Sequence, residues 1–129
     1  MKNMVFAMEL KGKVVPVTGT EHILQAKLAG RGPQAEPVAF ESTVILSGNT
    51  FNESGSIDYH GYGKLKFETV GVGHLGQSPV AGLQSGVVNW KVTDAQGAFT
   101  GATGYITSNF TISAEGDVVD NQYIRLFIP

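Results

Sequence analysis

Three histidines and eleven carboxylates are the side chains from which this chain of 129 residues could build a metal or acid–base site. No two of His22, His60 and His74 lie two or four residues apart, the spacings at which a strand or a helix presents both rings to one ion. Asp58 and His60 do, but two ligands are too few. Cysteine is absent, which also removes thiolate ligands. We therefore expect no metal site.

Motifs of nucleophilic and nucleotide chemistry are absent or lack their structural context. The segment GLQSG at residues 82–86 does not match Gly-x-Ser-x-Gly, and no strand-to-helix turn is expected that could expose a nucleophilic serine. The segment GVGHLG at residues 71–76 fits Gly-x-Gly-x-x-Gly, but no helix follows to hold a pyrophosphate. We therefore expect no cofactor.

Glycine and proline divide the chain into segments of strand length. The best helical candidate, Glu21–Ala29, fits a short helix or another strand, and Gly71–Leu83 is interpreted as a long loop, functional or mobile. In Lys64–Val70, apolar and charged residues alternate with the period of a half-buried strand. The expected strands are Val5–Leu10 and Lys13–Val17, separated at Lys11-Gly12, then Val38–Leu46, Ser56–Tyr59, Lys64–Val70, Gly86–Thr93, Phe99–Ser113 and Val118–Ile128.

About seven to nine short strands with short connections predict an all-β fold, either an up-and-down barrel or a sandwich. The apolar last segment, Tyr123–Ile128, favours the barrel, since it would be an aggregation-prone edge unless closure paired it. We predict a single domain over residues 1–129, a closed antiparallel β-barrel of about eight strands, mostly an up-and-down meander.

Charge and composition limit the partners. The net charge is -2 and the basic residues are scattered, so no basic stripe is available for nucleic acid. The apolar run before Glu9 is too short for a signal peptide or a membrane span, and the lack of cysteine is compatible with a reducing compartment. We expect a cytoplasmic protein whose partner is a small apolar molecule inside the barrel.

Polar side chains on otherwise apolar strands are the candidates for chemistry in that interior. If Trp90 faces one side of the sheet, then Asn89 and Lys91 face the other. An inward polar side chain is buried and needs a partner or a ligand, whereas the alternative is that it simply points to solvent. His60 and His74 are expected in loops at the barrel mouth, where either could also act as acid or base. The candidate catalytic residues are Glu68, Tyr59, His60, Asn89 and Arg125.

The segment GAFTGATG at residues 97–104 resembles the Gly-x-Phe-x-Gly-Ala-x-Gly hairpin of allene oxide cyclases and, more loosely, of dirigent proteins. The resemblance implies an eight-stranded antiparallel barrel and a metal-free cavity for an apolar substrate. Gly97 would then supply a turn with positive φ, and Phe99 would plug the barrel end. The N-terminal half shows none of the plant cyclase's catalytic pattern, so no catalytic residue is carried over.

Three functions follow from these expectations. The first is a cofactor-independent isomerase or cyclase that holds a small apolar or polyene substrate in a productive shape. The second is a lipocalin-like carrier, which predicts a uniformly apolar cavity without convergent polar groups. The third is a structural homo-oligomer whose barrel is filled by side chains and whose outer face carries the function.

Overall fold

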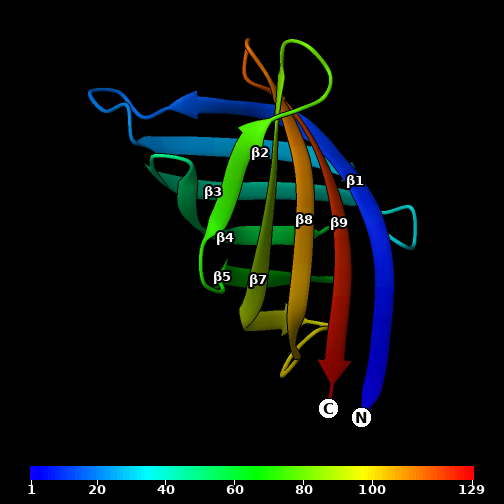
Figure 1. Cartoon of the computed structure of the whole chain (residues 1–129). Coiled ribbons are helices and arrows are strands. Elements are labelled where there is room, and N and C mark those ends of the chain that lie inside the picture. The colour runs from blue at the N-terminus through cyan, green and yellow to red at the C-terminus, as the bar shows by residue number, and fades with distance from the viewer.

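The computed structural model describes all 129 residues as nine antiparallel strands and their connections (Figure 1). The strands are β1 (Lys2–Pro16), β2 (Ile23–Arg31), β3 (Pro37–Ser47), β4 (Thr50–Tyr59), β5 (Gly63–Thr69), β6 (Gly73–Gln77), β7 (Leu83–Gly97), β8 (Thr103–Ser113) and β9 (Asp117–Ile128). No helix is present, and hence none long and apolar enough to cross a membrane. The all-β prediction is confirmed.

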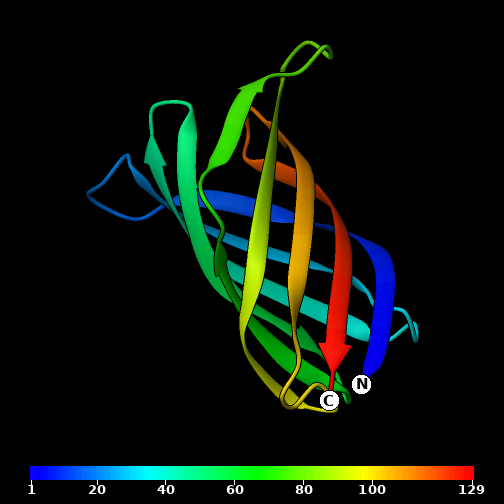
Figure 2. The same ribbon diagram turned by 60° about the horizontal axis from the view of Figure 1, so that its bottom comes forward.

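Eight of the strands close into a barrel, which Figure 2 shows from a second side. The ring runs β1-β2-β3-β4-β5-β7-β8-β9, and β9 returns to β1 along a seam from Lys2 opposite Ile128 to Lys13 opposite Asp117. The seam brings the two chain termini side by side at one end of the barrel (Figure 2). The predicted closed antiparallel barrel is confirmed, and the apolar last strand is paired along both edges.

The extra strand, β6, lies at the end of the barrel away from the termini. It pairs with β7 from His74 to Gln77 and with β4 at Thr50 and Phe51, beyond the point where β5 ends. The interpretation of Gly71–Leu83 as a loop is therefore wrong for Gly73–Gln77. Beyond the end of β5, the facing edges of β4 and β7 would have unpaired backbone groups. The backbone of β6 pairs with both edges.

Three further segments differ from, or settle, the sequence prediction. Glu21–Ala29, which fits a helix or a strand by sequence, lies largely in strand β2. Its residues Leu24, Ala26 and Leu28 turn inward at every second position, as in a strand. β1 runs without interruption through Gly12, where a Cβ would collide with the carbonyl oxygen of Lys27 on β2. β4 begins at Thr50 rather than at Ser56, so its first half was missed.

Aromatic side chains fill the middle of the barrel and the end near the termini. Phe40, Phe67 and Trp90 stack across the middle, with ring centroids 5.5 Å apart for the two phenylalanines and 4.2 Å apart for Phe67 and Trp90. Phe99, from the β7–β8 connection, is buried against Tyr59 with ring centroids 5.2 Å apart. Phe99 thus closes this end of the barrel, and any internal space must lie toward the other end.

The turn glycine of the β7–β8 connection offers a test of the fold. Gly97 has φ +67°, and a Cβ there would meet the Tyr62 carbonyl oxygen at 2.6 Å, whereas Gly48 has φ +62° and open space around it. We expect Gly48→Ala to lower the free energy of unfolding by about 1 kcal/mol through backbone strain alone, and Gly97→Ala by at least twice as much. Urea unfolding of both variants measures the difference. Equal losses would show that the Tyr62 backbone moves aside.

Candidate functional site

The barrel interior contains a cavity of about 60 Å³ toward the end that carries β6. By this measure a water molecule needs about 10–15 Å³, so the cavity holds a few waters or one small functional group. Thirteen of its sixteen lining residues are hydrophobic, and the three others are Glu53, Ser108 and Asp120. The hydrophobic ones are Val14, Leu24, Ala26, Leu28, Phe40, Val44, Leu46, Phe51, Leu75, Trp90, Phe110, Ile112 and Val118.

Two carboxyl groups face this apolar space from strands far apart in the sequence. Glu53 on β4 is 7% exposed and Asp120 on β9 is 2% exposed. Strand alternation places both inside, because Glu53 is in phase with buried Phe51 and Ile57, and Asp120 is in phase with buried Val118. Both carboxyl groups are thus almost completely shielded from solvent and line the cavity.

Neighbouring side chains hold both carboxyl groups in place. The Ser42 hydroxyl on β3 donates a hydrogen bond to Glu53 Oε2 at 2.6 Å. The Ser108 hydroxyl on β8 donates to Asp120 Oδ1 at 2.6 Å, and Gln122 Nε2 donates to Oδ2 at 2.8 Å. These contacts fix one oxygen of Glu53 and both oxygens of Asp120, so Glu53 keeps one oxygen available to the cavity.

The backbone of Glu53 is fixed separately, by Thr69 at the end of β5. The Thr69 hydroxyl accepts a hydrogen bond from the Glu53 backbone N–H at 2.8 Å and donates one to the Glu53 carbonyl oxygen at 2.7 Å. The last residue pair between β4 and β5 at this end is Ser54 opposite Glu68, so Glu53 has no paired residue on β5. The Thr69 side chain therefore replaces a strand partner at the residue that carries the cavity-facing carboxyl group.

Burial changes the acidity of both carboxyl groups. The pKa of Glu53 is raised from 4.5 to about 7, mainly by desolvation. The hydrogen bond from the Ser42 hydroxyl lowers it, the nearby charge of Asp120 raises it, and the Trp90 indole lowers it. Desolvation also raises the pKa of Asp120, against the hydrogen bonds from Ser108 and Gln122. Near neutral pH Glu53 is thus present in both protonation states.

Three buried polar atoms in the barrel have no hydrogen-bond partner: Trp90 Nε1, Gln122 Oε1 and the Tyr59 hydroxyl. Trp90 lines the cavity, and its indole N–H lies near enough to Glu53 to favour the charged carboxylate without forming a hydrogen bond of normal geometry. Gln122 leaves its amide oxygen unpaired while its amide nitrogen holds Asp120. Unpaired buried polar groups of this kind are uncommon in folded proteins.

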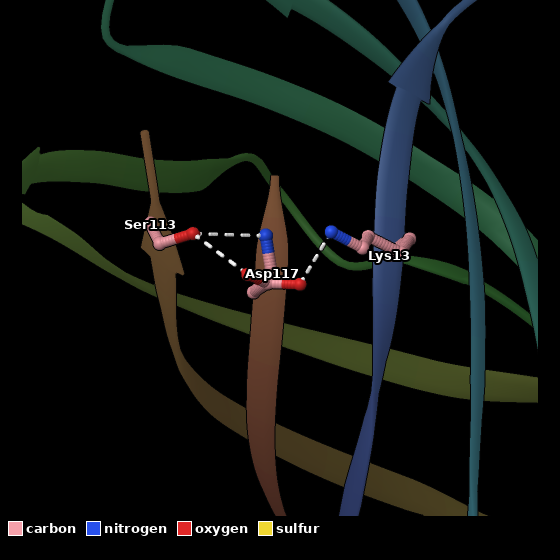
Figure 3. A network of polar contacts seen from close by, with 3 residues as sticks. All are labelled: Lys13, Ser113 and Asp117. Carbon is pink, nitrogen blue, oxygen red and sulfur yellow. Dashed lines mark hydrogen bonds and ion pairs between the residues drawn. The ribbon is translucent and has the colours of Figure 1, made fainter. Parts of the chain in front are cut away.

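Near the cavity residues Ile112 and Val118, polar contacts at the turn between β8 and β9 tie three strands together (Figure 3). The Lys13 ammonium of β1 forms an ion pair with Asp117 Oδ1 at 2.6 Å. The Asp117 backbone N–H donates to the Ser113 hydroxyl at 3.1 Å, which closes the turn. Lys13 lowers the pKa of the exposed Asp117 carboxyl group. Because Val14 and Val118 adjoin this pair and line the cavity, the contacts fix this side of the cavity.

Four of the five residues predicted for the site lie on the outer surface: Glu68, His60, Asn89 and Arg125. Glu68 forms an exposed ion pair with Lys91 at 3.1 Å, and Asn89 Oδ1 accepts a hydrogen bond from the Thr107 hydroxyl at 2.9 Å. His60 lies in the turn between β4 and β5, at the end of the barrel that Phe99 closes, and Arg125 lies opposite Val5 on the outer face. The strands of Glu68, Asn89 and Arg125 turn the neighbouring apolar residues inward, so these three side chains point outward.

Tyr59 is the one predicted residue that points inward. Burial raises the pKa of its phenol, and its ring packs between Phe6 and Phe99. It does not line the cavity. His74, the other histidine expected in a loop at the mouth, lies instead on β6 at the cavity end of the barrel. Its side chain is exposed.

The residues that sequence reasoning missed share one recognisable feature. Each is a polar residue at a position where the strand alternation calls for an apolar one. They are Ser42, Glu53, Ser108, Asp120 and Gln122. The inward position of Glu53 could not be recognised from a strand that is expected to begin only at Ser56. The inward positions of Asp120 and Gln122 can be recognised from their alternation with Ile124 and Leu126.

Fold and cavity together define a small antiparallel barrel with a mostly apolar internal cavity. No family model matches the sequence, and no curated protein matches it significantly. Among solved structures, the pterocarpan synthase dirigent protein GePTS1 is similar with a TM-score of 0.70 and 14% identity, over 98% of this chain and 88% of that one. This chain therefore has the barrel fold of a dirigent protein, as the resemblance of residues 97–104 implied.

The buried Glu53 carboxyl group makes stability depend on pH. With the pKa raised from 4.5 to about 7, the native state holds a proton that the unfolded state releases between these values. The free energy of unfolding should therefore fall as pH rises through this window, by a total on the order of 3 kcal/mol. Glu53→Gln should remove this part of the slope and be more stable than wild type at pH 8.

Urea unfolding at pH 5, 6, 7 and 8 measures this dependence. Glu68→Gln is the matched control, since Glu68 is exposed on the neighbouring strand and its removal should leave the slope unchanged. A wild-type slope equal to that of Glu53→Gln would contradict the burial of a titrating Glu53.

Proposed function

We propose that the protein is a cofactor-independent isomerase or cyclase that acts on a small apolar molecule inside the barrel. The observation that carries the proposal is the pair of buried carboxyl groups, Glu53 and Asp120, in an otherwise apolar cavity. Buried carboxyl groups without a counter-charge destabilise a fold, and a barrel core could be filled by apolar side chains instead. A carrier of apolar molecules has no need of the pair, which favours chemistry over carriage.

In the proposed reaction Glu53 gives and takes the proton. Its protonated form transfers the carboxyl proton to one carbon of a substrate double bond, which leaves a positive charge on the other carbon. The resulting carboxylate then removes a proton from the carbon beyond, so the double bond has moved and the acid is regenerated. In a cyclisation an internal nucleophile attacks the cation instead, and the proton it loses returns to Glu53. Neither route needs an oxidant or a second reactant.

Asp120 and the aromatic walls would stabilise the charge that develops. Asp120 is held by two hydrogen bonds that favour its ionised form, and Trp90 and Phe40 present ring surfaces to the same cavity. An apolar enclosure also excludes water that would capture the cation, and holding the substrate in one shape can contribute about 7–11 kcal/mol in favourable cases. The similar barrel is named a pterocarpan synthase, which supports use of this fold for small-molecule chemistry.

Access for a substrate larger than the cavity would require movement at the β6 end. Leu75 of β6 lines the cavity, and Phe51 and Phe110 pack edge to face with ring centroids 5.8 Å apart. β6 meets β4 at only two residue pairs. β6 is therefore weakly paired with β4, and its displacement from β4 would open the barrel interior from the side.

Proton exchange on a small enol ether tests this proposal without knowledge of the natural substrate. We expect the protein to speed deuterium incorporation next to the ether carbon of 1-methoxycyclohexene in D₂O, followed by NMR. The rate should rise as pH falls through about 7, because protonated Glu53 is the acid. Glu53→Gln should reduce the rate at least tenfold, and the surface control Glu68→Gln should not.

Fluorescence measured alongside the NMR experiment gives the outcome that would contradict the proposal. Trp90 is the only tryptophan and lines the cavity, so its fluorescence reports whether the probe binds. A probe that binds but exchanges no faster than in buffer would exclude acid chemistry by Glu53. A probe that neither binds nor exchanges would show that the interior does not admit a neutral molecule of this size, which would also contradict the proposal.

A further inference from the structure

The barrel interior contains acidic groups and no basic group. None of the nine lysines and arginines and none of the three histidines is buried or lines the cavity. Glu53 and Asp120 are thus the only ionisable groups that line it. Buried charges in proteins are normally paired with an opposite charge, and this pair has none from its own chain.

Hydrogen-bond acceptors also outnumber donors around the two carboxyl groups. Glu53, Asp120 and Gln122 present five acceptor oxygens, and their partners Ser42, Ser108 and Gln122 donate three hydrogen bonds in total. Gln122 Oε1 is fully buried without a donor. One donor remains unused, the Trp90 N–H beside Glu53. Gln122 does not line the cavity, so a ligand there meets the two carboxyl groups and must bring donors rather than acceptors.

Aromatic surfaces complete the surroundings of the carboxyl groups. Trp90, Phe40, Phe51 and Phe110 line the same cavity, and aromatic ring faces attract cations, with tryptophan the strongest. An ammonium group offers three donors, no acceptor and a positive charge. The cavity of about 60 Å³ accepts a group of that size, with an apolar body directed toward the rim residues Leu24 and Leu46.

We propose that the cavity binds an organic cation, a protonated primary amine with a short apolar body, whose ammonium group pairs with Glu53 and Asp120. This inference rests on the proposed function, because it assigns a ligand class to the same cavity. A cationic ligand also resembles the positively charged intermediate of the proposed reaction. Molecules that carry a carboxylate or a phosphate are excluded by charge repulsion in an enclosure of low polarity.

Three six-membered ring compounds of similar shape test the inference: cyclohexylamine, cyclohexanol and cyclohexanecarboxylate. Binding to the full-length protein at pH 7.5 is measured by Trp90 fluorescence and by calorimetry. We expect the amine to bind at least tenfold more tightly than the alcohol, and the carboxylate not to bind. Glu53→Gln and Asp120→Asn should each weaken amine binding at least tenfold and leave alcohol binding within twofold of wild type.

Two controls separate the cavity from the surface. Glu68→Gln removes one exposed carboxylate and should not change amine binding, and added salt should weaken it far less than it would an exposed ion pair. Wild-type protein alone decides the central comparison, so the inference stays testable if a variant fails to fold. Alcohol binding as tight as amine binding would overturn the cation inference while leaving the proposed function intact. Loss of the proposed function would instead appear as no binding of any neutral probe.

Discussion

The alternation of side chains in a closed barrel governs the rest of this structure. Once β9 pairs with β1, each strand has one face inside and one outside, and a residue's position in the alternation decides which side it occupies. Glu53 and Asp120 are inside because Phe51 and Val118 are. The serines and the glutamine that hold them occupy inward positions for the same reason. Every contact of the site is therefore set by strand phase and closure.

The sequence predicted the all-β barrel, whereas four of its five candidate site residues lie on the outer surface. Glycine spacing, short segments and the apolar last strand predicted the barrel, and the alternation in Lys64–Val70 was correct, with Leu65 and Phe67 buried. That alternation already placed Glu68 on the polar face, and Trp90 did the same for Asn89. The candidates were chosen from polar faces, whereas the site consists of polar residues that interrupt apolar faces. Glu53 could not be phased before the start of β4 was known.

The site also illustrates how a small barrel reconciles stability with chemistry. Most of the core is apolar and aromatic, concentrated between the middle of the barrel and the end closed by Phe99. The two buried carboxyl groups lie in the other half, where hydrogen bonds from Ser42, Ser108 and Gln122 offset part of the desolvation. The packed half can thus stabilise the fold while the hollow half contains the two carboxyl groups.

The seam between β1 and β9 also affects how the chain folds during synthesis. It joins the first and the last residues of the chain, so its contacts have the greatest sequence separation in the molecule and form slowly. During synthesis Glu53 emerges well before Asp120, and until β9 is complete the carboxyl group of Glu53 remains open to water. The two carboxyl groups therefore share one low-polarity cavity only after the seam between β1 and β9 has closed.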